Sequence, residues 1–223
     1  MAMQHTPLLM SNILDRGATI APNEEIVTMT ETGVRRQTYK QTRDRAHQLA
    51  HALAAAGIKV GDRVGTFMWN GSRHLEAYHA CAGMGAVLHT LNVRLGENDL
   101  DYIINHADDQ FIFVDPDFWP LIEQVAGECS NVKGWVVMAT PENMPDTELA
   151  NVYCYESLLE GQPDQFSWPE LDENAACALC YTSGTTGNPK GVLYSHRSTV
   201  LHTYATLMPD ALGMSGGDVV MPI

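Results

Sequence analysis

Residues 64–90 read VGTFMWNGSRHLEAYHACAGMGAVLHT and contain two short apolar runs separated by a segment with helical spacing. The runs Val64–Trp69 and Ala86–Thr90 have the length and composition of buried strands. Between them, Ser72 is placed to begin a helix that reaches about Met84. A strand, a helix and a second strand at this short interval predict two parallel strands with the helix packed against the sheet.

The same alternation continues along the chain. Glu97–Ala107 and Phe118–Ala126 carry apolar residues on one helical face, and each is followed by a short apolar run. Those runs are Phe111–Val114 and Trp135–Met138. We therefore expect an α/β fold with a mainly parallel sheet flanked by helices.

The segment before this unit predicts a hairpin and a helix. Glu25–Met29 and Val34–Thr38 have the composition of two short strands joined by a tight turn. Thr38 can cap a helix that runs to about Ala56, and Gly57 stands where a helix end favours a left-handed residue.

The segment Thr140–Glu173 interrupts the alternation, because it is rich in Pro, Asp, Glu and Asn. We interpret it as a surface excursion with one short helix near Tyr155–Leu159. Order is expected to resume with strands at Ala175–Tyr181 and Gly191–Tyr194, and with a helix over residues 195–208.

Composition limits the class of protein. The chain has 223 residues, 45% of them hydrophobic, and a formal net charge of -14 from 13 Lys+Arg against 27 Asp+Glu. A surface this acidic repels phosphate backbones, so we expect no nucleic-acid partner. There is no basic, apolar leader at Met1–Asn12 and no run of the ~20 apolar residues that a transmembrane helix needs, which favours a cytoplasmic protein. Five scattered cysteines do not resemble a disulfide framework.

The stretch Tyr181–Gly191, YTSGTTGNPKG, is the candidate binding loop. Its glycines let backbone N–H groups turn toward an anion, its hydroxyl groups can donate to phosphate oxygens or ligate Mg²⁺, and its lysine adds a mobile positive charge. The candidate phosphate-binding residues are Thr182, Ser183, Gly184, Thr185, Thr186, Gly187 and Lys190. So polar a segment is also expected to be exposed and poorly ordered without nucleotide, because little apolar burial offsets its ordering entropy.

The loop has two other interpretations, a plain polar hairpin and a Walker A loop. A plain polar hairpin does not account for the clustering of hydroxyl groups and glycines before Pro189–Gly191. A Walker A loop requires Gly–Lys–Ser/Thr followed by a helix, whereas here Pro189 precedes Lys190 and a strand is expected next. The spacing therefore excludes Walker A.

At Tyr181–Gly191 the sequence resembles the signature of the adenylate-forming (AMP-binding) superfamily. Three further stretches, Val192–Arg197, Ala86–Leu95 and Ile103–Asp108, resemble its fatty acyl-CoA synthetase branch, the medium- and long-chain fatty acid–CoA ligases. The resemblance implies the luciferase-like fold and a two-step reaction. ATP and a fatty acid give an acyl-adenylate and diphosphate, and coenzyme A then displaces AMP.

The resemblance also implies roles and limits. The loop would hold the β- and γ-phosphates of ATP, with Thr182 linked to Mg²⁺, and family members are often homodimers. The adenine-, ribose- and thioester-forming groups correspond to positions after Ile223, so residues 1–223 would be the N-terminal portion of the AMP-binding domain, with no catalytic residue of their own. Asp218–Ile223 is expected to begin a strand whose neighbours lie downstream. Such a fragment would be inactive alone.

Several other residues invite a functional interpretation. Cys177 and Cys180 have C-x-x-C spacing, but on a strand they point to opposite faces, so a structural role is favoured. Trp69 could line a cleft at a strand end, yet a packed tryptophan is the preferred interpretation. Asp108–Asp109 is interpreted as a solvated helix end, and His196 as a histidine hydrogen-bonded near a helix start.

Two alternative functions stay open at this point. One is another acid-activating adenylating enzyme, specific for aryl or amino acids, because the loop is shared by those branches. The other is a non-catalytic module that binds nucleotide or a protein partner.

Overall fold

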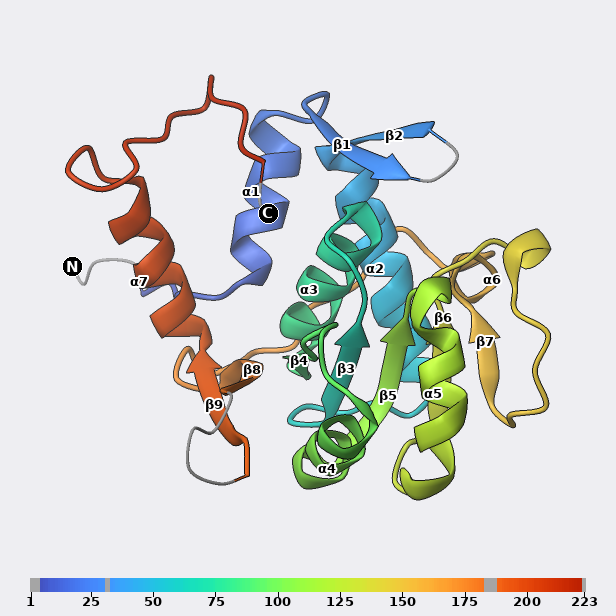
Figure 1. The fold of residues 1–223 in the computed structure, drawn as a ribbon. Helices are drawn as coiled ribbons and strands as arrows, with labels where there is room; N and C mark the ends of the chain where they lie inside the picture. The colour runs from blue at the N-terminus through green and yellow to red at the C-terminus, as the bar shows by residue number, and fades with distance from the viewer. Residues whose placement is uncertain (1–4, 31–32, 183–187, 222–223) are drawn as a thin grey trace.

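The computed structural model describes residues 5–30, 33–182 and 188–221. Their centre is a sheet with the strand order β7-β6-β5-β3-β4-β8-β9 (Figure 1). Every neighbouring pair is parallel except β8 and β9, which are antiparallel. The predicted parallel sheet is confirmed. The strands are β3 (Arg63–Phe67), β4 (Val87–Thr90), β5 (Asp109–Val114), β6 (Gly134–Val137), β7 (Val152–Cys154), β8 (Ala176–Thr182) and β9 (Lys190–Ser195).

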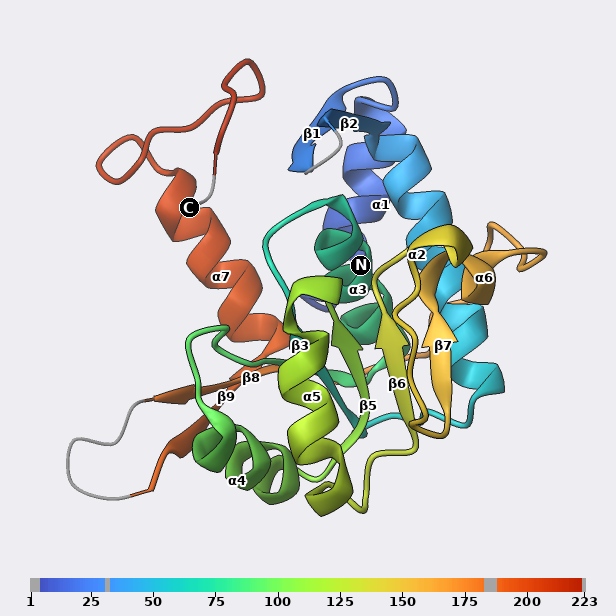
Figure 2. The same ribbon diagram turned by 45° about the vertical axis from the view of Figure 1, so that its right-hand side comes forward.

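Helices cover both faces of this sheet. One hydrophobic cluster joins α2 and α3 to the sheet, and a second joins α4 and α5 to its other face (Figure 2). The helices are α1 (Ser11–Ile20), α2 (Tyr39–Ala55), α3 (Ser72–Met84), α4 (Glu97–Ala107), α5 (Trp119–Val125), α6 (Tyr155–Leu159) and α7 (His196–Leu207). None of the helices in the described part of the chain is long and apolar enough to cross a membrane.

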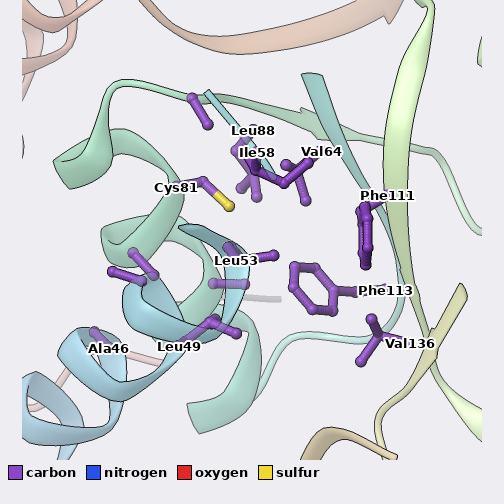
Figure 3. Packing of buried hydrophobic residues seen from close by; sticks show 14 of the residues in the cluster. Ala46, Leu49, Leu53, Ile58, Val64, Cys81, Leu88, Phe111, Phe113 and Val136 are labelled. Carbon is purple, nitrogen blue, oxygen red and sulfur yellow. The ribbon is translucent and has the colours of Figure 1, made fainter. Parts of the chain in front are cut away.

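The first cluster forms the larger core. Leu49 and Leu53 of α2 lie against Phe113 of β5, and all three side chains are almost completely buried (Figure 3). Because side chains alternate along a strand, Phe111 and Phe113 face this cluster while Ile112 and Val114 belong to the second one. The continuous apolar run Phe111–Val114 in β5 follows from this burial on both faces.

The predicted hairpin and its helix are present. β1 (Glu25–Thr30) pairs antiparallel with β2 (Gly33–Thr38). Thr38 accepts a hydrogen bond from the Gln41 backbone N–H, and the Gln41 side chain accepts one from the Thr38 N–H. This capping box begins α2, and Gly57 after its end has a φ of +89°.

Two elements were not predicted, and one predicted strand is absent from the described residues. The helix α1 was not predicted, because Met10 before it makes no side-chain cap and only a short face is buried. The strand β7 within Thr140–Glu173 has just three residues and depends on pairing with β6. Residues 218–221 form no strand, since they pair with no other described segment, and Val219 is 99% exposed.

Candidate phosphate-binding site

The candidate loop joins β8 to β9 at an edge of the sheet (Figure 1). Thr182 and Lys190 face each other in register where the two strands meet the loop, and the Thr182 hydroxyl lies 3.5 Å from the Lys190 carbonyl oxygen. Both residues are exposed, as predicted. The other five candidates, Ser183, Gly184, Thr185, Thr186 and Gly187, lie outside the described residues, and so does the expectation about the order of the loop.

Lys190 is a free cation in the part of the chain that the structure describes. No carboxylate there lies within 4.0 Å of its ammonium group, although eight ion pairs between arginines and carboxylates elsewhere show how readily this acidic chain pairs its cations. A cation beside an exposed threonine hydroxyl, at the mouth of a glycine-rich loop, fits the oxygens of a polyphosphate. The residues present are therefore compatible with ATP and its Mg²⁺.

Tyr181, which precedes the loop, is held from two sides. Its hydroxyl group forms a 2.6 Å hydrogen bond with Nδ1 of His106 at the end of α4. Its ring packs 5.2 Å, centroid to centroid, from that of His89 on β4. Burial raises the pKa of Tyr181, so the phenol remains a neutral hydrogen-bonding group near neutral pH. The contact with His106 was not anticipated, because the two residues are 75 positions apart.

A buried polar pair lies beneath Tyr181. Nδ1 of His89 is 2.8 Å from Oδ2 of Asp109, and both side chains are completely buried. Asp109 begins β5, His89 lies on β4, and Gly65 lies on β3 between them. A Cβ on Gly65 would stand 3.1 Å from the Ile112 side chain and 3.4 Å from the Asp109 carboxylate, so Gly65 lies directly beside this contact across the central strand.

The prediction for Asp108–Asp109 was half right. Asp108 is the left-handed residue that ends α4, and it forms an ion pair with Arg63. Asp109 is not solvated: burial raises its pKa, and the hydrogen bond to His89 offsets part of this effect. The difference arises because the strand begins one residue after the helix ends and turns Asp109 inward.

The two cysteines and His196 are structural. Cys177 contacts the Thr199 hydroxyl of α7, whereas Cys180 contacts the Thr90 hydroxyl of β4, so the pair does not converge. No group of three or more His, Cys, Asp or Glu side chains in the described chain could hold a metal ion. His196 is fully buried and accepts a hydrogen bond from the backbone N–H of Met10, a long-range contact rather than a local one.

The preferred interpretation of Trp69 was wrong. Its side chain is 54% exposed and lines a cleft between the β1–β2 hairpin and the loops that follow β3 and β5. Its ring contacts that of Phe118, with the ring centroids 5.1 Å apart. The ring is exposed because β3 ends at Phe67, two residues earlier than predicted, and Trp69 is therefore in the loop.

Comparison with known families matches residues 14–223 to the AMP-binding enzyme family. The chain belongs to this family. The AMP-binding match includes the whole of the candidate loop and the strands on either side of it. It confirms the superfamily that Tyr181–Gly191 indicated.

Three curated AMP-binding relatives align with 222 residues, 99% of this chain. They are the long-chain-fatty-acid–CoA ligase of Thermus thermophilus (44% identical), the 3-methylmercaptopropionyl-CoA ligase of Ruegeria lacuscaerulensis (43%) and the medium-chain-fatty-acid–CoA ligase of Ectopseudomonas oleovorans (42%). The chain spans 39%, 41% and 41% of their respective lengths.

Solved structures support the same fold. The Mycobacterium tuberculosis fatty acyl CoA synthetase superposes with a TM-score of 0.74 at 22% identity, over 89% of this chain and 37% of that one. An anthranilate CoA ligase in complex with anthranoyl-AMP superposes with a TM-score of 0.76, also at 22% identity, over 88% of this chain and 36% of that one. The α/β fold inferred from the sequence is therefore the fold of adenylate-forming CoA ligases.

Proposed function

We propose that residues 1–223 are the N-terminal portion of the AMP-binding domain of a fatty acid–CoA ligase. The reaction is ATP + fatty acid + CoA to acyl-CoA + AMP + diphosphate, through an acyl-adenylate. The observation that carries the proposal is the 42–44% identity to medium- and long-chain fatty acid–CoA ligases over nearly the whole chain. Because the chain spans about two fifths of those relatives, activity belongs to the longer protein.

In this proposal the β8–β9 loop binds the polyphosphate of ATP. Lys190 and the hydroxyl and backbone N–H groups from Thr182 to Gly187 contact the phosphate oxygens, and Thr182 helps to hold Mg²⁺. Bound Mg²⁺ supplies positive charge to the diphosphate leaving group. Negative charge develops on that group as the acyl-adenylate forms, so donors already in place lower the barrier. Tyr181, fixed by His106 and His89, sets where the loop leaves the sheet.

A second acid, 3-methylmercaptopropionate, is supported as a substrate by the sequence comparison. The 3-methylmercaptopropionyl-CoA ligase is 43% identical, as similar to this chain as the fatty acid–CoA ligases are. A short thioether acid is thus the alternative to a fatty acid. The proposal also includes the use of Mg²⁺ and coenzyme A, a cytoplasmic location and a homodimer. These four points are supported only by membership of the AMP-binding family.

A chimera tests this proposal directly. Residues 1–223 would replace the aligned part of the Thermus thermophilus long-chain-fatty-acid–CoA ligase, with which they share 44% identity. The chimera should convert fatty acids, ATP and CoA to thioesters detected by mass spectrometry, and Lys190→Ala should abolish turnover. A parallel series of aryl acids, amino acids and 3-methylmercaptopropionate defines the acid class.

The isolated chain is the matched control, because it should form no thioester under the same conditions. A chimera that folds and binds ATP but activates only aryl or amino acids would overturn the assignment to fatty acids. Turnover by residues 1–223 alone, lost on Lys190→Ala, would overturn the assignment of the reaction to the longer protein.

A further inference from the structure

A cleft lies at the point where the sheet changes its direction of winding. The chain passes from β3 to β4 on one side through α3, and then crosses back through α4 to β5 on the other side of β3. The loops after β3 and β5 consequently diverge, and open α/β sheets bind ligands in the crevice this creates. The strand order β4-β3-β5-β6-β7 matches a common doubly wound order. In proteins with that order, the ligand lies between the loops that correspond to those after β3 and β5.

The cavity at this place has the size of a small-molecule site. Its volume is about 810 Å³, within the roughly 300–1,000 Å³ of typical ligand pockets. It is lined by residues 28–30 and 33–35 of the hairpin, 68–73 after β3, 115–117 after β5, and 138–140 and 143–144 after β6. We call it the hairpin cleft. The hairpin is fixed over the crevice, since the Thr28 hydroxyl accepts a hydrogen bond from the Ser72 N–H.

The wall on the hairpin side carries excess positive charge. Arg73 lies 2.7 Å and Arg35 3.6 Å from the same carboxylate, that of Glu156. Arg45 also pairs with Glu156 and with Glu76, so three guanidinium groups share two carboxylates. Burial, and then repulsion by Arg73 and Arg45, lowers the pKa of Arg35. Its charge is the least compensated of the three, and it lines the cleft.

The loop after β5 brings two carboxylates to the same cavity. Asp115 accepts a hydrogen bond from the Trp69 backbone N–H at 2.6 Å, and Asp117 accepts one from the Trp69 indole N–H at 3.3 Å. Neither carboxylate has a cationic side chain within 4.0 Å in the described structure, where the ion pairs of the cleft arginines go to Glu156. Burial, and then the neighbouring charge of Asp117, raises the pKa of Asp115 to about 6, although the hydrogen bond from Trp69 and the positive charge of Arg73 oppose part of this effect.

Apolar side chains also line the cavity. Half of the Trp69 side chain is exposed, and Met68, Met138 and Met144 line the same cavity. An indole face is also a favourable neighbour for an ammonium group, through attraction to the ring electrons. The hairpin cleft therefore offers a cation, apolar side chains and two anions within one cavity.

We propose that the hairpin cleft binds a small zwitterion, with a carboxylate facing Arg35, an ammonium group facing Asp115 and Asp117, and a short apolar segment against Trp69. A ligand of one charge would meet repulsion from one wall and leave the other unpaired, whereas a zwitterion satisfies both. Figures 1 and 2 both place the β1–β2 hairpin at the opposite end of the molecule from the end of β8, so this site is distinct from the phosphate loop.

NMR of the indole N–H groups tests the proposal on the intact chain. The Trp69 signal, assigned through Trp69→Phe, would be followed during titration with 6-aminohexanoate, hexanoate and hexylamine as probes of matched length. The zwitterion should bind roughly two- to fivefold more tightly than either singly charged probe, the size expected for one partly exposed charge pair. ATP with Mg²⁺ should not displace it.

Single substitutions test which side chain binds each charged group of the zwitterion. Arg35→Gln should remove the advantage of 6-aminohexanoate over hexylamine, and Asp117→Asn should reduce its advantage over hexanoate. Arg36→Gln is the matched control, since Arg36 is exposed, pairs with Glu25 and does not line the cleft. Equal binding of all three probes, no shift of the Trp69 signal at saturating probe, or unchanged selectivity in folded Asp117→Asn would each overturn the proposal.

Discussion

His79 should make the stability of this chain sensitive to mild acid. The side chain is only 7% exposed on α3, and its Nδ1 atom has no hydrogen-bond partner in the described structure. Burial lowers its pKa from 6.5 to about 4, although the negative charge of Asp15 opposes part of the effect. The folded protein therefore keeps the imidazole neutral at a pH where the unfolded chain protonates it.

The size of the effect follows from these two pKa values. Between pH 6.5 and pH 4 the unfolded state binds more protons, so the free energy of unfolding falls as the pH falls. With pKa values of about 4 and 6.5, the loss at pH 5 is roughly 2 kcal/mol, against roughly 0.2 kcal/mol at pH 7. His74, whose pKa is also lowered to about 4, acts in the same direction, and Asp115 in the opposite one.

Urea unfolding at pH 7 and pH 5 measures this contribution. The loss of stability between the two pH values should be roughly 2 kcal/mol smaller in His79→Leu than in the wild type, because His74 and Asp115 are present in both and cancel. His79→Gln has a different baseline stability but should show the same reduction. An equal loss in the wild type and both variants would refute the argument that His79 is buried in its neutral form.

Three further predictions concern packing and hydrogen bonds. Glu76→Ala should cost ~3–5 kcal/mol of unfolding free energy, because it leaves buried donors unpaired, whereas exposed Glu25→Ala should cost less than ~0.5 kcal/mol. Equal losses would contradict the buried network. Tyr181→Phe should lower the free energy of unfolding by ~0.5–1.5 kcal/mol. In a double-mutant cycle, the same substitution made in a His106→Ala background should cause no further loss. Phe113→Ala should lower the free energy of unfolding by ~3–5 kcal/mol in the same assay, because the side chain is fully buried. A loss below ~1 kcal/mol would mean that Phe113 is not tightly packed in the core.

Much of the fold could be predicted because its signals are local. The strand β5 contains the unbroken apolar run Phe111–Val114, and α2 carries both a capping threonine and a glycine after its end. Such features depend on neighbours within a few residues. Thr182 and Lys190 could likewise be paired from sequence, since a hairpin loop brings its two ends together.

The rest depends on contacts between distant segments. Asp109 is buried where it reaches His89 across the central strand, and no local sequence pattern predicts that arrangement. The exposure of Trp69 depends on where β3 ends and on a hairpin about forty residues upstream. The hairpin cleft was missed for the same reason, because its charged walls come from separate parts of the chain.

The central claim is that the β8–β9 loop binds the polyphosphate of ATP. Calorimetric titration of residues 1–223 with ATP and Mg²⁺ tests it most directly, using Lys190→Ala and, as a matched control, Lys59→Ala, which removes an exposed lysine after α2. The wild type and Lys59→Ala should bind equally, and Lys190→Ala should bind roughly tenfold or more weakly, because a charge-assisted contact to phosphate is lost. Equal affinity in all three proteins, or no binding by the wild type, would contradict the account.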